Sequence, residues 1–562
     1  MSHRRIAATA AVLAAGISLV PGTAHAADGP ADGKAHGVSA SDLAAAKAKA
    51  SQLPTFTSPA GRAVKSAAPA SGGSKATAQA QGAAAATEPT YTVALKGKAT
   101  SAHGISLETS VTGDPGQSLS VTIDWGDNGW KQSFGVSGSR VETMPHNYAE
   151  VGTYLITVTV EDTSAQTSVT NTLTVTTAGS DYTPYGPTRL LDTRDGTGAP
   201  QHKVAPYSPV RVKIGGNGGI PAGVTAVALN VTVTGTTSGG HVTAYAGGGS
   251  LPTTSNVNFA PGQTVPNLVI VPVGADGYVN LYNGGWESVD LIADVAGYFT
   301  HSASSGYTPM APARFVDTRS GLGTAKGQLA GYGTFSTQIT GLRGVGANAT
   351  AVALNVTVTN PRSAGHLTVY PSGQSAPTAS NVNFTAGQTI ANSVIVPVGP
   401  DGRISVRNGG WNPADVIVDV VGYYSPTGTS AYRPTEPFRL LDTRDSNDWA
   451  WGPLGGRGYI YMPLGAKYPN DRGYVLNTTV TNTRDNGYLA VTPDPNTKEA
   501  YDNGWDVWPP EPTSSNLNWT VGKTVPNLVQ ASTGSTGVID FWNQSDGDID
   551  LIVDMFGFYE DN

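Results

Sequence analysis

At 562 residues the chain is too long for a single hydrophobic core, so its length predicts several domains. Charged residues make up only 13% of it, while 70 glycines and 38 prolines favour short strands and turns over long charged helices. A net charge of −8 without a basic run makes nucleic acid and anionic lipid poor partners, and the absence of cysteine excludes disulfides and thiol chemistry.

Residues 1–26 have the pattern of a secretory signal peptide. Arg4-Arg5 gives a positive start, residues 6–20 are apolar and small, and Ala24-His25-Ala26 fits a small-x-small cleavage site. No later run reaches the ~18 apolar residues that a membrane span needs. We therefore expect a secreted protein, extracellular or loosely associated with the cell surface, without a transmembrane span.

Residues 27–88 consist mainly of Ala, Gly, Ser, Pro and Lys, with almost no large apolar residue. Such a composition cannot bury enough surface to offset the entropy of ordering the chain. We interpret the segment as a disordered linker, and a cleaved pro-segment remains the alternative. One short helix is possible within it, over residues 41–50, with Ser41 or Asp42 as the N-cap.

From Tyr91 onward the pattern becomes that of half-buried strands. Residues 118–124 and 154–160 alternate strictly between apolar and polar positions. Trp125-Gly126-Asp127, followed by His146-Asn147-Tyr148, resembles the motifs of PKD domains over residues 91–177. The resemblance implies an immunoglobulin-like β-sandwich of the kind that serves as a spacer or binding module on secreted proteins.

Three carboxylates of this stretch are candidate calcium ligands, namely Asp124, Asp127 and Asp162. The other interpretation is that Asp124 and Asp127 accept hydrogen bonds from turn amides. We expect no cofactor apart from this possible calcium ion.

A repeat organises the remainder of the chain. Arg-x-x-Asp-Thr-Arg begins at Arg189, Arg314 and Arg439, at intervals of 125 residues (314 − 189 and 439 − 314). Each copy closes on Asp-x-x-x-Asp-x-x-Gly. We expect three homologous β modules over residues 182–300, 307–425 and 432–560, joined by flexible polar linkers.

Each module has strand signals throughout and no helical stripe. In module 1, residues 227–234 alternate between apolar and polar positions, and residues 269–281 suggest a hairpin with a turn at Asp276-Gly277. Each copy is long enough to bury its own core. The fold class predicted for the whole chain is therefore all-β, with seven or eight strands in each sandwich or barrel module.

Arginine at the start of each module and aspartate at its end suggest that the first and last strands lie side by side. Asp192 and Arg194 would share one face of the first strand, and Asp290 and Asp294 one face of the last. We interpret the recurring charges as a structural clasp of arginine–carboxylate pairs. A cation site at the aspartate pair and a glycosidase-like carboxylate pair are the alternatives. The clasp residues are Arg189, Asp192, Arg194, Asp290 and Asp294; Arg314, Asp317, Arg319, Asp415 and Asp419; and Arg439, Asp442, Arg444, Asp550 and Asp554.

The candidate ligand-binding residues lie in Asn283-Gly-Gly-Trp286 and Asn408-Gly-Gly-Trp411. A tryptophan on a glycine-rich loop can stack on a sugar ring, with asparagine supplying hydrogen bonds. The alternative is that the indole folds back over the end of the core. Module 3 lacks this tryptophan and carries instead an aromatic insertion that contains Trp505 and Trp508.

The repeats resemble R-L-L-D-T-R modules of secreted proteins of Gram-positive bacteria, a resemblance that supports secretion and modularity and carries no settled activity. No nucleophile elbow, zinc-protease motif or phosphate-binding loop occurs in the sequence. We therefore expect a secreted, non-catalytic, multivalent protein that binds a polysaccharide or cell-envelope polymer. The alternatives are a structural spacer or scaffold that contacts another secreted protein and, less favoured, a hydrolase with an unrecognised site.

Overall fold

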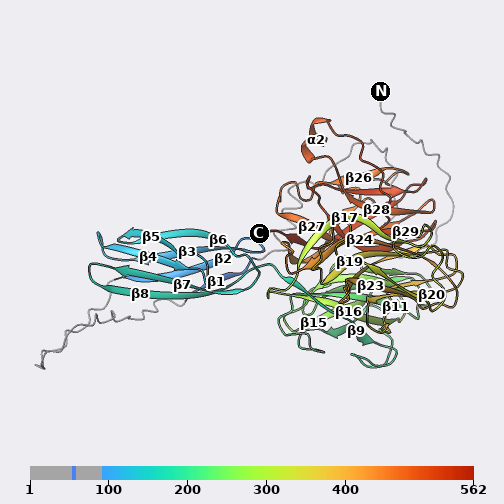
Figure 1. Ribbon diagram of the computed structural model, residues 1–562, viewed down its shortest axis with the longest axis horizontal. Coiled ribbons are helices and arrows are strands. Elements are labelled where there is room, and N and C mark those ends of the chain that lie inside the picture. The colour runs from blue at the N-terminus through green and yellow to red at the C-terminus, as the bar shows by residue number, and fades with distance from the viewer. Residues whose placement is uncertain (1–52, 59–90) are drawn as a thin grey trace, which may run out of the picture. The chain divides into compact units, whose positions relative to one another are not determined.

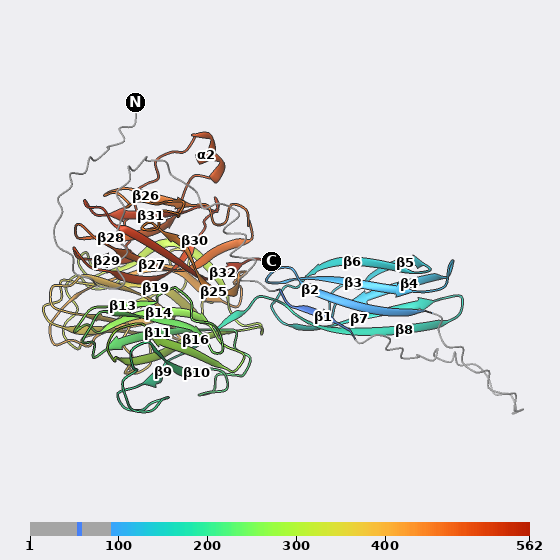
Figure 2. The same ribbon diagram turned by 180° about the vertical axis from the view of Figure 1, so that it is seen from behind.

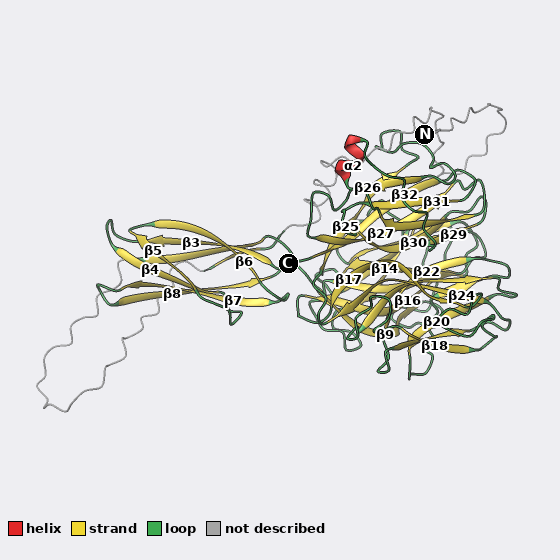
Figure 3. Ribbon diagram, turned by 45° about the horizontal axis from the view of Figure 1, so that its top comes forward, coloured by secondary structure: helices red, strands yellow, loops and turns green. Residues whose placement is uncertain are grey.

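The computed structural model describes residues 53–58 and 91–562, which form two compact units. One unit holds the PKD-like sandwich and the other holds the three repeated modules (Figure 1). The described chain is almost entirely β-structure, with the short helix α2 (Lys498–Asn503) as its only helix (Figure 3). The predicted all-β fold class is confirmed. The expected signal peptide and the possible helix at 41–50 lie outside the described residues.

The PKD-like unit is a sandwich of two four-stranded antiparallel sheets with strand orders β1-β2-β3-β6 and β5-β4-β7-β8. Alternating apolar side chains of the two sheets meet in one core, which includes Trp125 and Tyr148. The strands are β1 (Thr55–Thr57), β2 (Thr92–Ala99), β3 (Gly104–Thr112), β4 (Ser118–Asp124), β5 (Gln132–Ser137), β6 (Arg140–Asn147), β7 (Thr153–Asp162) and β8 (Thr167–Thr176).

Strand β1 corrects the prediction of a disordered linker at residues 53–58, and the rest of the segment 27–88 lies outside the described residues. Thr55–Thr57 pairs with β2, and Phe56 packs against the core of the sandwich. Ser58 is held at both backbone and side chain: its N–H donates to Leu95 O at 3.0 Å, and its hydroxyl accepts from Asn171 Nδ2 at 3.0 Å. The average composition of the segment did not reveal this short stretch, in which Leu53 and Phe56 have apolar surface to bury.

Each repeated module is also a sandwich of two four-stranded antiparallel sheets, with eight strands in each copy. In module 1 the inner sheet has the order β14-β11-β16-β9 and the outer sheet the order β10-β15-β12-β13. Its strands are β9 (Asp181–Asp192), β10 (Ser208–Lys213), β11 (Ala226–Thr234), β12 (Gly240–Ala246), β13 (Val257–Phe259), β14 (Val265–Pro272), β15 (Tyr278–Asn283) and β16 (Asp290–Thr300).

Modules 2 and 3 repeat this topology strand for strand. Module 2 contains β17 (Gly306–Asp317), β18 (Thr334–Gln338), β19 (Ala351–Thr359), β20 (Gly365–Pro371), β21 (Val382–Phe384), β22 (Ile390–Pro397), β23 (Arg403–Asn408) and β24 (Asp415–Ser425). Module 3 contains β25 (Ala431–Asp442), β26 (Tyr459–Met462), β27 (Asp471–Thr481), β28 (Gly487–Pro493), β29 (Leu517–Trp519), β30 (Val525–Ser532), β31 (Ile539–Gln544) and β32 (Asp550–Glu560).

The hairpin predicted around Asp276-Gly277 is wrong. β14 pairs with β11 in the inner sheet, whereas β15 pairs with β10 and β12 in the outer sheet. The turn therefore carries the chain from one layer of the sandwich to the other. A short turn between two strand patterns does not by itself distinguish these connections.

The strands of the three modules lie together in one body (Figure 2). Each module keeps its own core, and all three also share a central one. The inner sheets are buried on both faces: every residue from Ala226 to Val233 is buried. Small residues and aromatic rings of all three inner sheets meet there. The central core comprises Tyr182, Ala226, Ala228, Leu268, Ile270, Ala296, Phe299, Tyr307, Ala351, Ala353, Ile395, Val421, Tyr424, Tyr432, Val475, Leu528, Phe556 and Tyr559.

The contacts between modules run in a closed ring. Asn230 of module 1 donates to Ser380 O of module 2 at 2.7 Å, Asn355 of module 2 donates to Ser515 O of module 3, and Asn477 of module 3 donates to Ser255 O of module 1 at 2.7 Å. A second ring of amides accompanies the first: Asn392–Asn230 at 3.0 Å, Asn527–Asn355 at 3.1 Å and Asn267–Asn477 at 3.1 Å.

The segments between modules were predicted as flexible linkers, and here the structure differs. Tyr182 N–H donates to Ser305 O at 3.0 Å, and Tyr307 N–H donates to Ser430 O at 2.8 Å. The three modules accordingly form one compact unit.

The closing Gly-aromatic motif has a packing reason. A Cβ at Gly297 would collide with the buried ring of Tyr182, whose hydroxyl donates to Ala296 O at 2.9 Å. Gly422 and Tyr307 repeat this contact in module 2, as Gly557 and Tyr432 do in module 3. Glycine allows the opening tyrosine of each module to lie flat on the last strand.

Candidate functional site: exposed aromatic pairs and the charge clasp

The first and last strands of module 1 are held together by Arg189. Its Nε and Nη2 donate to both carboxylate oxygens of Asp294, at 2.9 and 3.2 Å, and its Nη1 donates to Asp192 at 3.0 Å. Arg194 donates two further hydrogen bonds to the Asp192 carboxylate, from Nε at 2.9 Å and from Nη2 at 2.7 Å. The result is a continuous chain of charges, Arg194–Asp192–Arg189–Asp294, across the paired strands β9 and β16.

The other two modules repeat this arrangement. Arg314 Nε lies 2.8 Å from Asp419, and Arg439 Nε lies 2.8 Å from Asp554. Arg319 and Arg444 donate to Asp317 and Asp442 with the same fork geometry as Arg194. A guanidinium that bridges two strands in this way fixes their register, because it must meet both carboxylate oxygens at once.

Two details differ from the predicted clasp. β9 ends at Asp192, so Arg194 lies in the following turn, where its N–H donates to Asp192 Oδ1 at 3.1 Å. Asp290, moreover, accepts from Thr193 Oγ1 at 3.0 Å, while its nearest cation, Lys203, is 3.8 Å away. Asp415 and Asp550 accept from Thr318 and Thr443 in the same way. The partner of the first aspartate of each closing motif is therefore the threonine of Asp-Thr-Arg. The prediction considered only charged residues and did not include this threonine.

The electrostatics of the clasp oppose acid–base catalysis. Hydrogen bonds from Arg194 hold the pKa of Asp192 below its usual range. Burial raises the pKa of Asp294, but Arg189 opposes this shift and occupies both carboxylate oxygens. A general acid needs a carboxyl group that can reach a substrate, and these carboxyls are already engaged.

An exposed tyrosine–tryptophan pair marks the same loop position in modules 1 and 2. Trp286 is 52% exposed and lies edge-on to Tyr207, with ring centroids 5.8 Å apart. Trp411 is 80% exposed and lies edge-on to Tyr332, with centroids 5.2 Å apart. The indoles therefore do not fold back over the core. Each pair presents two apolar rings to solvent at a fixed mutual angle.

The tyrosines were not predicted, although they too lie 125 residues apart (332 − 207). Both adopt left-handed backbone conformations, with φ of +51° at Tyr207 and +57° at Tyr332. A bulky residue rarely occupies this region, because it costs of the order of 1 kcal/mol or more. Searching for aromatic residues at the repeat interval could have found the pair, but nothing in the sequence places Tyr207 beside Trp286.

The asparagines of the two loops are not ligand-binding residues, which corrects the prediction for Asn283 and Asn408. Both side chains are fully buried. Asn283 Nδ2 donates to Val204 O and Glu287 O at 3.1 and 2.9 Å, and its Oδ1 accepts from Gly285 N at 2.9 Å. Asn408 makes the equivalent bonds. These amides hold the loop in the shape that presents the tryptophan.

Module 3 has a different exposed surface. Its insertion over residues 494–513 carries α2, which is capped by the Thr497 hydroxyl and by Gly504. Trp508 packs edge-on against Tyr459 and Trp542, with centroid distances of 5.1 and 5.8 Å. Trp508 remains 64% exposed and Trp505 70% exposed. The two predicted tryptophans therefore belong to an aromatic surface unlike that of the other modules.

A carboxyl pair lies beneath this insertion. Asp494 accepts from Asn496 N and from the Tyr501 hydroxyl, both at 2.5 Å. Asp540 is 1% exposed, and its carboxyl lies beside the Trp542 indole N–H and the Asp494 carboxyl. Burial first, and then the neighbouring Asp494 carboxyl, raise the pKa of Asp540 well above its usual range. No arginine contacts this pair in the described chain, yet its burial keeps it away from a polymeric substrate.

The three aspartates proposed as calcium ligands in the PKD-like unit do not come together. Asp124 and Asp162 lie near opposite ends of β4. Their carboxylates accept turn amides, Gly126 N for Asp124 and Ala165 N for Asp162, while Asp127 accepts from Gly129 N at 2.9 Å. Within residues 53–58 and 91–562 there is no cluster of three or more His, Asp or Glu side chains suited to a metal ion. The turn interpretation therefore replaces the calcium site.

The comparisons with known proteins are sparse. No family model and no curated protein matches the chain. Among solved structures it is similar to the N-terminal CBM22-1–CBM22-2 tandem domain of Paenibacillus barcinonensis Xyn10C, with 11% identity and a TM-score of 0.14, over 44% of this chain and 93% of that one. A similarity of this size does not bear on what the chain binds. In the described part of the chain, no helix has the length and apolar character to cross a membrane.

Proposed function

We propose that this chain is a secreted, non-catalytic, multivalent binding protein whose modules 1 and 2 bind a polysaccharide or cell-envelope polymer. The observation that carries the proposal is the pair of matched aromatic surfaces, Tyr207 with Trp286 and Tyr332 with Trp411. An exposed indole and phenol at a fixed angle form an apolar platform onto which the C–H face of a sugar ring can stack. The repetition of the platform in two modules favours a repetitive ligand.

The loop architecture supports the same proposal. A loop held by a buried asparagine presents its tryptophan with little conformational freedom left to lose on binding. Two such sites on one chain gain avidity, because binding at the first raises the effective concentration of ligand at the second. Sites that are individually weak would then suffice to retain the protein on a polymer.

The PKD-like unit fits the role of a spacer, and the charge clasps fit a structural role. Each of the aspartate pairs considered for catalysis is either bound by arginine and threonine or buried under the module 3 insertion. These placements favour binding over hydrolysis as the work of the molecule.

The test is retention of the mature chain on insoluble cellulose, chitin and purified peptidoglycan. The double variant Trp286→Ala/Trp411→Ala should lose retention on the polymer that holds the wild type. The matched control is Arg457→Ala/Asp546→Ala, which alters the equivalent exposed position of module 3 and should retain it. Unchanged retention of the tryptophan variant would contradict the proposal. Capture by a secreted protein, with no retention on any polysaccharide, would favour the scaffold alternative.

A further inference from the structure

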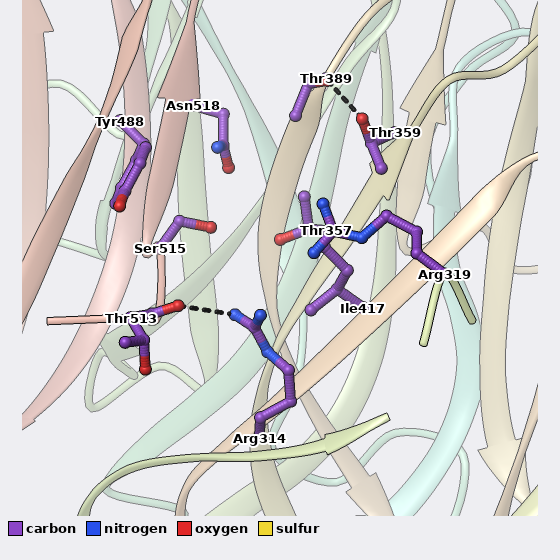
Figure 4. Close-up of a pocket in the computed structure, with 10 residues that line it drawn as sticks. All are labelled: Arg314, Arg319, Thr357, Thr359, Thr389, Ile417, Tyr488, Thr513, Ser515 and Asn518. Carbon is purple, nitrogen blue, oxygen red and sulfur yellow. Dashed lines mark hydrogen bonds between the residues drawn. The ribbon is translucent and has the colours of Figure 1, made fainter. Parts of the chain in front are cut away.

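A cavity of about 250 Å³ lies between modules 2 and 3, apart from the exposed aromatic pairs (Figure 4). Module 2 contributes two arginines and a set of threonines, and module 3 contributes hydroxyl, amide and phenol groups. The argument rests on six of the residues around it: Arg314, Arg319, Thr357, Tyr488, Ser515 and Asn518. Both modules are needed to form this cavity.

The charges of the cavity are balanced. Arg314 is paired with Asp419, and Arg319 with Asp317. Arg314 Nη2 also donates across the interface to Thr513 O at 3.0 Å. Two guanidiniums offset by two carboxylates leave no net positive charge for an anion to neutralise. The ligand chemistry that fits is therefore neutral and rich in hydrogen-bonding groups.

Two buried polar atoms face this space without a partner. The Thr357 hydroxyl is on a side chain that is only 1% exposed, and it has no hydrogen bond within the described chain. Across the interface the Asn518 side chain is half-buried, and its Oδ1 atom is buried without a hydrogen-bond partner among the described residues. An unsatisfied buried hydroxyl or amide destabilises a fold unless something else bonds to it. Together, one hydroxyl and one acceptor provide the pattern that a sugar hydroxyl can satisfy.

The buried threonine hydroxyl occurs three times around the ring. Thr232 and Thr479 occupy the positions of Thr357 in modules 1 and 3, and their hydroxyls are likewise buried and without a partner among the described residues. The two arginines recur as Arg189 with Arg194 and as Arg439 with Arg444. The residues across each interface recur as Ser380 with Asn383 and as Ser255 with Asn258, where the Ser255 hydroxyl donates to Asn258 Oδ1 at 3.1 Å. A single unsatisfied hydroxyl could be incidental, but three at one repeat position indicate a shared role.

We propose that each of the three inter-module interfaces holds one neutral sugar residue, bonded to the buried threonine hydroxyl and to the asparagine amide across the interface. The class of ligand rests on the proposed function, whereas the location of the site does not. Tyr488 borders the cavity in the described interface, and His366 and His241 stand at its position in the other two. Each interface therefore offers a ring beside its polar groups. The asparagine ring between modules fixes the site before ligand arrives.

The test uses the full mature chain and five free monosaccharides: glucose, galactose, mannose, xylose and N-acetylglucosamine. Binding is measured by saturation-transfer NMR and by calorimetry. We expect at least one sugar to bind the wild type at three sites per chain. The triple variant Thr232→Val/Thr357→Val/Thr479→Val should weaken that binding about tenfold or more, since each site loses a hydrogen bond to the ligand. The triple Thr→Ser variant keeps the hydroxyl and should bind as the wild type does.

The valine variant has a second readout, which binding alone would not provide. Valine has nearly the shape of threonine without the hydroxyl, so the ligand-free triple variant should melt at a higher temperature than the wild type. Lost binding together with a raised melting temperature supports the site. Binding of none of the five sugars, or equal binding by the valine variant, overturns it.

The outcomes separate this site from the exposed aromatic pairs. If the valine variant binds normally while Trp286→Ala/Trp411→Ala loses polymer retention, the proposed function stands and the inter-module site falls. If the tryptophan variant keeps both retention and monosaccharide binding while the valine variant loses the latter, the aromatic platforms fall and the inter-module site stands.

Discussion

Arg457 and Asp546 form an ion pair, with Nε and Oδ1 2.9 Å apart, at the position where the other modules carry a tyrosine and a tryptophan. Arg457 keeps the left-handed backbone of Tyr207 and Tyr332, with φ of +59°. Its N–H donates to Ser545 O at 3.0 Å, as Tyr332 N–H donates to Gly410 O at 3.1 Å. Module 3 therefore has the same loop framework with different side chains on it.

This framework predicts a gain of function. The double variant Arg457→Tyr/Asp546→Trp should create a third aromatic pair, because the backbone that presents it already exists. Retention on the polymer that binds the wild type should rise on the order of tenfold through added avidity. The measurement is the depletion isotherm of wild type and variant on that polymer.

The single variant Arg457→Tyr, which lacks the tryptophan, is the control and should stay near the wild type. An unchanged isotherm for a correctly folded double variant would show that the two rings are not sufficient for binding.

The clasp predicts a large loss of stability from one substitution and a small loss from its neighbour. Arg314→Met leaves the buried Asp419 carboxylate without its partner, which should lower the free energy of unfolding by about 3–5 kcal/mol. Arg319 is 48% exposed at its side chain, so Arg319→Met should cost less than about 1 kcal/mol. Denaturant unfolding of the full chain measures both.

The loss in Arg314→Met should also depend on pH. Burial already raises the pKa of Asp419, and removing the arginine raises it further. The carboxyl then protonates as the pH falls, so the deficit should shrink in acid. Equal deficits at low and neutral pH would show that the cost is lost packing rather than an uncompensated charge.

We predict that replacing the buried Asp540 by asparagine stabilises the folded protein. Its pKa is raised on folding, so the folded state holds a proton that the unfolded chain releases above about pH 4. Its contribution to stability is complete below that pH and is lost progressively as the pH rises toward the folded pKa. Asp540→Asn removes this dependence and can donate to Asp494. The variant should gain roughly 1–3 kcal/mol over the wild type at neutral pH and little near pH 4.

Denaturation curves over this pH range measure the effect. Asp506→Asn, which changes an exposed carboxylate of the same insertion, serves as the control and should follow the wild type. A variant that is less stable than the wild type at neutral pH would mean that the Asp540 carboxylate is ionised and bound in the folded protein.

The ring of asparagine amides between the modules predicts that Asn527, which lies far from both tryptophan loops, contributes to the stability of the protein. Asn527 donates to Asn355 Oδ1 at 3.1 Å and accepts from Ser393 N at 3.0 Å, both across an interface. Asn527→Ala should leave these buried groups unsatisfied and lower the unfolding free energy by about 2–4 kcal/mol. Exposed Asn503→Ala should change it by less than about 1 kcal/mol. Thermal unfolding that separates into module-by-module transitions in Asn527→Ala would identify the interface as the weakened element.

The sequence predicted that the modules are built of strands and that arginine pairs with aspartate across the first and last strand, because both features leave a pattern within one copy of the repeat. Alternation at 227–234 predicted a strand, and Arg189 with Asp294 predicted that the ends of the module pair. The second face of that strand carries Ala228 and Asn230, and small or polar residues are equally typical of a surface in water. Nothing in the sequence distinguishes a face that packs against another module from one that faces solvent.

The candidate site was predictable only in part for a related reason. Trp286 could be found from its glycine-rich loop, but Tyr207 lies 79 residues earlier (286 − 207), and its contact depends on how two loops of the outer sheet meet. Asn283 was assigned to ligand because the sequence cannot show that its amide is already fully bonded. The buried threonines of the interfaces could not be identified from the sequence. They are candidates because their hydroxyls have no hydrogen-bond partner among the described residues, and a sequence does not show which hydrogen bonds are made.

The closed circuit of contacts between modules has a consequence for how this architecture can grow. An open array lengthens by adding units at its ends, but here the last copy already docks on the first, so no vacant docking face is left for a fourth. Duplication within such a gene would be held at three copies by geometry. Diversity would then have to arise by rebuilding one member, as the aromatic insertion of the last copy illustrates.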